Sequence, residues 1–264
     1  MDRTRLRKAT TTETQTLAAT LKTTLRTIHY FWTEKIIINK QTTMTDDFQN
    51  KIRYHINRFI FDNGFAPSVD ELVKLTVTDT EKVEQGLKVL ADNHALVLHP
   101  NSFDIWVAHP FALFPTLFWV KSADKQWWGN CTWCSFGIAT LTNAETEIFT
   151  KLQGQEEPLT IHIKDNKVVE EDFVVHFPIP ASKFWDNVIY TCANVLTFRN
   201  ENEVDEWCKR HNKPKGQVLP IGQVWELSKL WYGNYLDKDF KRKTKQVAEE
   251  IFKQVGLTSD FWKL

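Results

Sequence analysis

The first regular feature of the chain is an apolar repeat at helical spacing that ends at a defined stop. The repeat consists of Ile52, Ile56, Phe59 and Ile60. Spacings of three and four residues place these side chains on one face of an α-helix. Asn63-Gly64 follows, and glycine commonly ends a helix because it accepts left-handed backbone angles. Residues from Asp47 onward are therefore predicted to form a helix with one buried face.

Two further helices and a hairpin are predicted after this helix. Pro67-Ser68 begins the second helix, and Thr78 with Glu81 forms a capping box for the third. The hairpin is predicted from two short strand patterns, residues 96–99 and 103–108. Three helices followed by a hairpin are typical of a winged-helix domain, which we expect over residues 47–110.

The charge pattern gives this winged helix no evident nucleic-acid partner. The chain has 33 lysine and arginine residues and 33 aspartate and glutamate residues, so its formal net charge is zero. The polar side of the third predicted helix mixes both signs, with Asp79, Glu81, Lys82, Glu84, Gln85 and Lys88. A DNA backbone requires a basic surface. We therefore expect a structural domain and no nucleic-acid partner; a metal-sensing regulator that binds DNA is a weaker alternative.

Residues 1–46 differ in composition from the rest of the chain. They are rich in threonine, arginine and lysine and poor in acids, which predicts a disordered extension. An organelle-targeting peptide and translation from Met44 are alternatives. No apolar run in the sequence is long enough to span a bilayer or to form a secretory signal. We therefore expect a cytoplasmic protein with no membrane partner.

Residues 111–264 combine strand and helix patterns, which predicts an α+β fold. The strands are predicted at residues 159–163, 168–177 and 188–198. The helices are predicted at residues 131–141, 204–211, 224–235 and 240–255.

Three of the four cysteines form a candidate site. Cys131 and Cys134 stand three residues apart where a loop enters a predicted helix. The free N–H groups and the dipole at a helix N-terminus favour a thiolate, so Cys131 is a candidate nucleophile of low pKa. Cys192 lies in the strand predicted at 188–198, and only the fold can bring it to the pair. A zinc knuckle or a redox pair are alternatives for Cys131 and Cys134, and a buried, inert thiol is the alternative for Cys192.

The pattern around these cysteines resembles the organomercurial (alkylmercury) lyases. The shared order is an aromatic residue, a Cys-x-x-acid motif, a distant cysteine in a strand, and a helix that bears a tryptophan. The resemblance covers residues from about 48 to 235. It implies a winged-helix-like domain followed by an α+β catalytic domain with a mixed or antiparallel sheet.

The resemblance assigns roles residue by residue. Cys131 matches the first catalytic cysteine of the family and Cys192 matches the second. Cys134 stands where the family has the catalytic aspartate that relays a proton to carbon, and this is the chief departure. The helix after Cys192 matches through Glu206, Trp207 and His211, and a family cysteine expected near Leu152 is absent.

The resemblance implies cleavage of a carbon–mercury bond by protonolysis, a detoxification reaction that yields hydrocarbon and thiol-bound mercury(II). Mercury(II) is soft and prefers thiolate ligands. Cys131 is expected to attack, Cys192 to complete the chelate, and Cys134 to relay the proton or to hold the product. No organic cofactor is expected; the partners are a small organomercurial and cellular thiols that release the metal. The alternative is a non-catalytic protein in which Cys131, Cys134 and Cys192 bind mercury(II) or copper(I).

Other residues near these motifs have less specific interpretations. Asp186 is a candidate substitute proton carrier, with a solvated turn residue as the alternative, and Cys208 is expected to pack or to lie at the surface. Four scattered histidines are expected to be structural, namely His109, His162, His176 and His211. Four tryptophans are candidates to wall an apolar pocket, with core packing as the alternative: Trp127, Trp128, Trp133 and Trp185.

Overall fold

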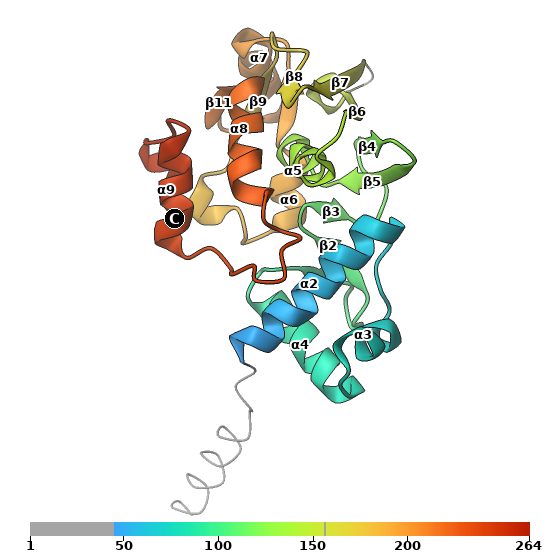
Figure 1. Cartoon of the computed structure of the whole chain (residues 1–264). Helices are drawn as coiled ribbons and strands as arrows, with labels where there is room; N and C mark the ends of the chain where they lie inside the picture. Colours follow the sequence, from blue (N-terminus) through green and yellow to red (C-terminus); the bar gives the residue numbers. More distant parts are fainter. Residues whose placement is uncertain (1–44, 156) are drawn as a thin grey trace, which may run out of the picture. The chain divides into compact units, whose positions relative to one another are not determined.

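Three helices joined by short turns open the part of the chain that the structure describes (Figure 1). The structure is a computed structural model and describes residues 45–155 and 157–264. The extension predicted over residues 1–46 lies almost entirely outside these ranges. The helices are α2 (Asp46–Asn63), α3 (Val69–Thr76) and α4 (Thr80–Asp92).

The predicted helix boundaries follow from local hydrogen bonds. Gly64 ends α2 with a left-handed backbone, φ 80°. Ser68 and Glu71 form a reciprocal capping box at the start of α3. The cap of α4 lies one residue beyond the predicted Thr78, because the Asp79 side chain accepts a hydrogen bond from the Lys82 amide at 2.8 Å.

An eight-stranded sheet follows the helices, and every neighbouring pair of its strands is antiparallel. Its order is β1-β2-β3-β5-β4-β6-β7-β8. The strands are β1 (Val97–Leu98), β2 (Ile105–Ala108), β3 (Phe111–Ala112), β4 (Phe118–Ser122), β5 (Lys125–Gly129), β6 (Thr146–Lys151), β7 (Pro158–Lys164) and β8 (Lys167–Val168). The predicted hairpin is thus the edge of a sheet that continues to β8.

A second, smaller antiparallel sheet has β9 at its centre, between β10 and β11. Its strands are β9 (Val174–Phe177), β10 (Leu196–Phe198) and β11 (Gln217–Pro220). The remaining helices are α5 (Thr132–Thr142), α6 (Val188–Ala193), α7 (Glu201–His211), α8 (Ile221–Tyr232) and α9 (Lys245–Gln254). Antiparallel sheets with separate helices confirm the predicted α+β class.

The strand predicted at 188–198 is wrong for most of its length. Residues Val188–Ala193 form helix α6, and only β10 is extended. The Asn187 side chain caps this helix by accepting from the Tyr190 amide at 2.9 Å. A short apolar run does not by itself distinguish a strand from a buried helical turn. The hydrogen bond of the Asn187 cap favours the helix at this position. Cys192 therefore lies on a helix.

The strand predicted at 168–177 is divided into β8 and β9. Between them, the Glu170 carboxylate accepts a hydrogen bond from the His162 amide at 2.7 Å. This contact holds the segment that contains Glu170 and Glu171 against β7. The chain then passes from the large sheet to the small one. The predicted helices at 224–235 and 240–255 are observed as α8 and α9 with shifted ends.

Helix α5 lies at the centre of the core. Its first eight residues, Thr132 to Ala139, are all buried, and the helix packs on the large sheet and on α8. Gly137 permits the close approach to α8, because a Cβ there would lie 2.4 Å from the Tyr232 ring. The Cys131–Cys134 segment is thus held from both sides.

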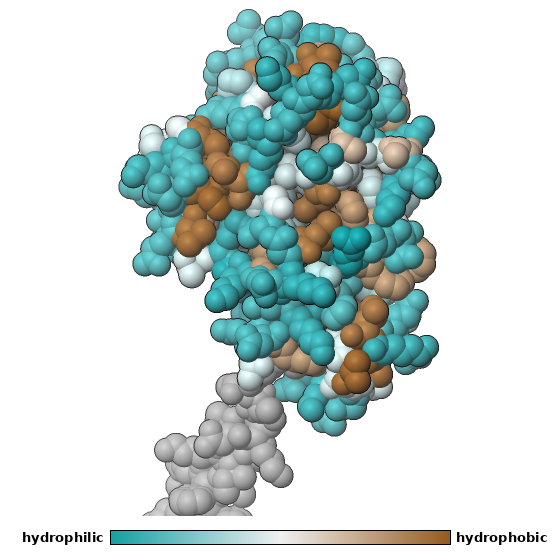
Figure 2. Space-filling view, viewed as in Figure 1, coloured by the Kyte–Doolittle hydropathy of each residue, from teal (hydrophilic) through white to brown (hydrophobic). Residues whose placement is uncertain are grey.

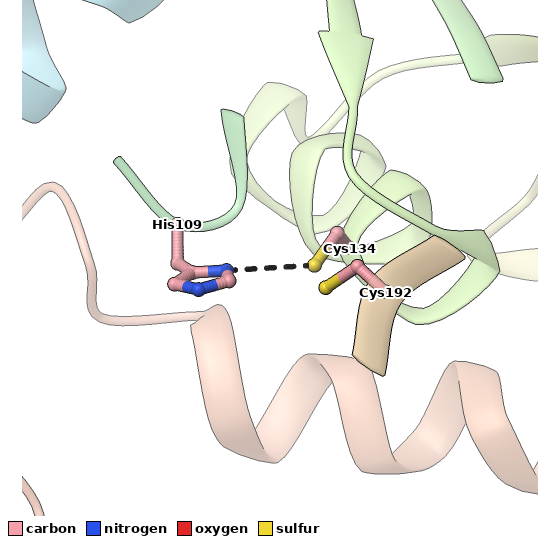
Figure 3. Close-up of side chains that lie close together, drawn as sticks. All are labelled: His109, Cys134 and Cys192. Carbon is pink, nitrogen blue, oxygen red and sulfur yellow. Dashed lines mark hydrogen bonds between the residues drawn. The ribbon is translucent and has the colours of Figure 1, made fainter. Parts of the chain in front are cut away.

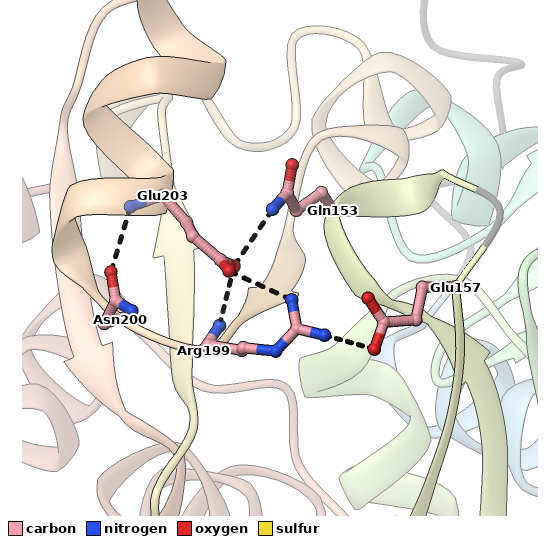
Figure 4. A network of polar contacts seen from close by, with 5 residues as sticks. All are labelled: Gln153, Glu157, Arg199, Asn200 and Glu203. Atoms are coloured by element: carbon pink, nitrogen blue, oxygen red, sulfur yellow. Dashed lines mark hydrogen bonds and ion pairs between the residues drawn. The ribbon is translucent and has the colours of Figure 1, made fainter.

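Polar contacts at the surface fix the segment that follows α6 (Figure 4). The Glu203 carboxylate accepts from the Gln153 amide at 2.9 Å and pairs with Arg199 at 3.0 Å. Arg199 also pairs with Glu157. These contacts join β10 and α7 to the connection between β6 and β7, although exposed ion pairs contribute little stability individually.

The surface in Figure 2 is mainly hydrophilic, with separate hydrophobic areas such as the one in the region of α9. Among the residues that the structure describes, no helix combines the length and the apolarity needed to cross a bilayer.

Candidate thiol site

Cys131 is the N-cap residue of α5. Its backbone is extended, with φ −160°, and its sulfur accepts a hydrogen bond from the Cys134 amide at 3.4 Å. The preceding Asn130 is fixed by its side-chain bond to the Pro110 carbonyl at 3.1 Å. The following Thr132 hydroxyl contacts the Thr197 hydroxyl at 3.0 Å. The sulfur therefore stands at a helix N-terminus that is tied to two other segments.

Cys134 lies one helical turn further, with its sulfur between two polar groups. The Nδ1 atom of His109 is 3.7 Å from the sulfur, and the Tyr232 hydroxyl is 3.5 Å away. His109 comes from the turn between β2 and β3, and Tyr232 comes from the end of α8. Three separate segments thus meet at this thiol.

Cys192 reaches the same point from α6. Figure 3 shows the His109 ring and the sulfurs of Cys134 and Cys192 directed toward one another, and the three ligand atoms all lie within 4.8 Å of one another. The Cys131 thiol in turn contacts both of the other thiols. All three cysteines that the sequence singled out therefore converge, even though the predicted strand for Cys192 is a helix.

The three thiols differ in acidity because each polarises the others. Burial raises the pKa of Cys131 well above its ordinary value, and hydrogen bonds with the other two thiols, together with burial, do the same for Cys192. Burial also opposes ionisation of Cys134, but hydrogen bonds from Cys131, Cys192 and His109 outweigh it and hold the Cys134 pKa well below its ordinary value. The sequence predicted Cys131 as the acidic thiol. The structure gives Cys134 that character, since it receives the most hydrogen bonds.

A cavity of about 880 Å³ opens at the thiols. Eight aromatic side chains line it, and they are Trp133, Phe177, Phe184, Trp185, Trp231, Tyr232, Tyr235 and Phe240. Two of the four tryptophans predicted as a wall, Trp133 and Trp185, take part. Trp127 packs in the core and donates to the Ile60 carbonyl at 3.2 Å, while Trp128 packs edge-on against Trp119.

Other candidates lie away from the thiols. Asp186 is exposed and pairs with Lys183 at 3.2 Å. Cys208 is buried, lies 3.6 Å from His176 Nε2 and does not line the cavity. His162 pairs with two glutamates, and His211 packs on Trp207 within α7.

His109 and Tyr232 are the site residues that sequence reasoning missed. His109 stands 22 positions before Cys131, counted on the printed sequence, and no ligand spacing links the two. Its Nε2 atom is buried and has no hydrogen-bond partner among the described residues. In the sequence, Tyr232 resembles an ordinary core residue at the end of a helix. Only the packing of α8 on α5 brings its hydroxyl to a thiol.

The fold and the site together define an α+β protein with three buried cysteine sulfurs and one imidazole at an aromatic cavity. Such a donor set suits soft metal ions. Residues 111–233 match the family model MerB, alkylmercury lyase. The mercury-bound crystal form of MerB2 shares the fold at a TM-score of 0.56 and 20% identity, over 71% of this chain and 91% of that chain. No curated protein matches the chain. The family match over residues 111–233 and the shared fold confirm the resemblance to the alkylmercury lyases that was drawn from the sequence.

Proposed function

We propose that this protein cleaves the carbon–mercury bond of small organomercurials, giving a hydrocarbon and mercury(II) bound by thiolates. The observation that carries the proposal is the buried cluster of three thiols within the residues that match the alkylmercury lyase model. The Cys134 and Cys192 sulfurs lie within 4.8 Å of each other, and Cys131 is hydrogen-bonded to both. No organic cofactor is needed. Cellular thiols in the cytoplasm are the partners that deliver the substrate and remove the metal.

The first step exchanges one thiolate for another. The substrate arrives as R–Hg–X, where X is an external thiolate. The Cys131 sulfur forms a bond to mercury, the Hg–X bond breaks, and X leaves with the proton of Cys131 as the free thiol. The helix N-terminus supports the sulfur as its charge develops.

The second step breaks the carbon–mercury bond. Cys192 bonds to mercury while its proton passes to Cys134, with which it shares a hydrogen bond, and Cys134 gives a proton to the leaving carbon. The products are R–H and the Cys131–Hg–Cys192 chelate. Cys134 stands at the position of the family's acid, and its lowered pKa lets it alternate between thiolate and thiol as a carboxylate does.

The aromatic wall gives the organic group a place to bind. Trp133, Phe184 and Trp231 surround the thiols with apolar surface, so an alkyl or aryl group leaves water when mercury binds. Exclusion of water also favours delivery of the proton from a thiol rather than from solvent.

The second candidate function is binding of a soft metal without catalysis. Replacement of the family's carboxylate by Cys134 provides a third sulfur, and His109 adds a nitrogen donor. Three sulfurs and one nitrogen are also a donor set that zinc accepts. This function predicts tight, stoichiometric binding of mercury(II), copper(I) or zinc and no hydrocarbon release.

The test measures hydrocarbon released from phenylmercury in excess external thiol. We expect slow turnover by wild type, because a thiol at position 134 can also trap the product, and faster turnover by Cys134→Asp. Cys131→Ser and Cys192→Ser should lose activity, and Cys192→Ser should bind mercury(II) far more weakly. Cys208→Ser is the matched control, since it removes a buried thiol away from the site.

Two outcomes would reject the proposal. If neither wild type nor Cys134→Asp releases hydrocarbon while mercury(II) still binds, the correct function is metal binding without catalysis. If Cys131→Ser retains full activity, the residue assignment is wrong.

A further inference from the structure

A buried guanidinium lies at the wall of the thiol cavity, with Tyr235 as its polar neighbour. Arg53 extends from α2, and neither its Nη1 nor its Nη2 atom has solvent access or a hydrogen-bond partner among the described residues. Its Cζ atom lies 3.4 Å from the centre of the Phe240 ring and 4.4 Å from that of Tyr235. Burial lowers the Arg53 pKa to about 10, so the group is still a cation at neutral pH. A buried charge is costly unless an opposite charge pairs with it.

A second cation lies beside the first. The Nζ atom of Lys243 is 4.9 Å from the Tyr235 ring centre and 5.2 Å from that of Phe240, the same two rings that Arg53 contacts. Its polar contact is the Asn234 side-chain oxygen at 3.3 Å. Burial, and then the charge of Arg53, lower the Lys243 pKa to about 8. Within the described part of the chain, neither cation forms an ion pair with a carboxylate.

The two cations belong to the same cavity as the thiols. The Tyr235 ring lies 4.9 Å from the Tyr232 ring, and the Tyr232 hydroxyl contacts the Cys134 sulfur. Two aromatic rings thus separate the cations from the thiols. Asp46 and Asp47 also line the cavity, but both are exposed to solvent at the start of α2 and do not neutralise the buried pair.

We propose that Arg53 and Lys243 form an anion-binding part of this cavity, which takes a carboxylate on the ligand whose mercury the thiols bind. The inference rests on the proposed function and narrows its substrate class. A guanidinium offers two parallel N–H donors to a carboxylate. Neither terminal nitrogen of Arg53 has a hydrogen-bond partner in the described part of the chain. The carboxylate has two possible sources, which are the organic group of the mercurial and the external thiol that accompanies it.

The experiment compares phenylmercury with 4-carboxyphenylmercury, each in excess 2-mercaptoethanol and each in excess thioglycolate. With the neutral thiol, wild type should show a kcat/KM at least about tenfold higher for the carboxylated mercurial, the expected effect of one buried charge-assisted contact. If instead thioglycolate raises the kcat/KM of both mercurials about tenfold over 2-mercaptoethanol, the external thiol is the source of the carboxylate. No gain from a carboxylate on either the mercurial or the thiol would overturn the inference.

Variants assign the preference to the two cations. Arg53→Met and Lys243→Met should each bring the ratio of the two kcat/KM values toward one, and Arg53→Lys should keep part of it. Arg58→Gln is the matched control, because Arg58 lies on the same helix, is exposed and pairs with Asp62 at 2.7 Å. It removes the same charge and should leave the ratio as in wild type. A preference that survives both methionine variants would refute the assignment.

Two further readouts keep the inference separate from the proposed function. If no mercurial is cleaved, the proposed function fails, and the charge preference is then measured as mercurial binding through tryptophan fluorescence; equal affinities would overturn the inference as well. The free energy of unfolding of Arg53→Met should equal or exceed that of wild type, since an unpaired buried charge is removed. A clear loss of stability together with an unchanged ratio would mean that Arg53 serves packing alone.

Discussion

Replacing Gly137 with alanine tests how tightly the site depends on the contact between α5 and α8. A Cβ at this position would lie 2.4 Å from Cδ2, 2.7 Å from Cγ and 2.8 Å from Cε2 of Tyr232. These atoms are near the root of the ring, so rotation of the side chain cannot remove the clash. The ring must therefore shift by about 1 Å to reach ordinary contact, and its hydroxyl must leave its position beside Cys134.

The energy of the substitution has two opposing parts. Overpacking of a filled core costs up to about 3 kcal/mol. Alanine in a helix interior recovers up to about 1 kcal/mol relative to glycine. We therefore expect the free energy of unfolding of Gly137→Ala to be lower than that of wild type by about 2 kcal/mol. Urea unfolding followed by tryptophan fluorescence measures it.

Gly222→Ala is the matched control for this prediction. Gly222 lies in α8, and a Cβ there would meet no atom within 4 Å. This variant should be more stable than wild type by up to about 1 kcal/mol, because alanine reduces the freedom of the unfolded chain. If Gly137→Ala were as stable as Gly222→Ala, the close packing of α5 on Tyr232 would not exist as described.

Three further predictions concern other parts of the molecule. Trp133→Ala should lower the free energy of unfolding by about 3 to 5 kcal/mol, measured in urea, because the ring packs against four other aromatic rings; a loss below about 1 kcal/mol would contradict its central place. Gly64→Ala should lower it by about 1 kcal/mol, because φ is 80° at the end of α2, and an unchanged stability would show that this cap relaxes freely. Lys243 has a pKa of about 8 when folded, below its ordinary 10.5, so the unfolded chain binds more protons between pH 8 and 10.5 and stability should rise with pH in this window. Lys243→Met should remove that rise. If the free energy of unfolding depended on pH identically in wild type and Lys243→Met, the prediction would be refuted.

The sequence predicted best where a local signal had a single structural solution. Helix α2 repeats its apolar residues at helical spacing and stops at a glycine, and the structure has it within one residue of the predicted start. The short strands β3 to β6 were missed, since their residues carry no alternation strong enough to distinguish them from loops. The run around Cys192 was misassigned because the Asn187 cap outweighs the strand preference of its valine and isoleucine residues.

The site was predictable in its sulfurs but not in its other groups. Cys131 and Cys134 carry their own signal through spacing at a helix start, and the family resemblance added Cys192. His109 and Tyr232 reach the thiols only because β3 and α8 both pack on α5. Arg53 escaped notice for the same reason: in sequence it is one basic residue of an amphipathic helix, and only packing shows that both of its terminal nitrogens are buried.

The use of a sulfur atom as the cap of α5 couples the helix to whatever the sulfur binds. The Cys131 sulfur accepts the Cys134 amide at 3.4 Å, a role that serine, threonine or aspartate oxygens usually fill. Burial raises the pKa of Cys131, so this cap is a neutral thiol, which is a weak acceptor. In the proposed reaction Cys131 loses its proton when it bonds to mercury, and the more negative sulfur would then accept the Cys134 amide more strongly. The first turn of α5, which carries Cys134, would therefore be held most firmly while the metal is bound.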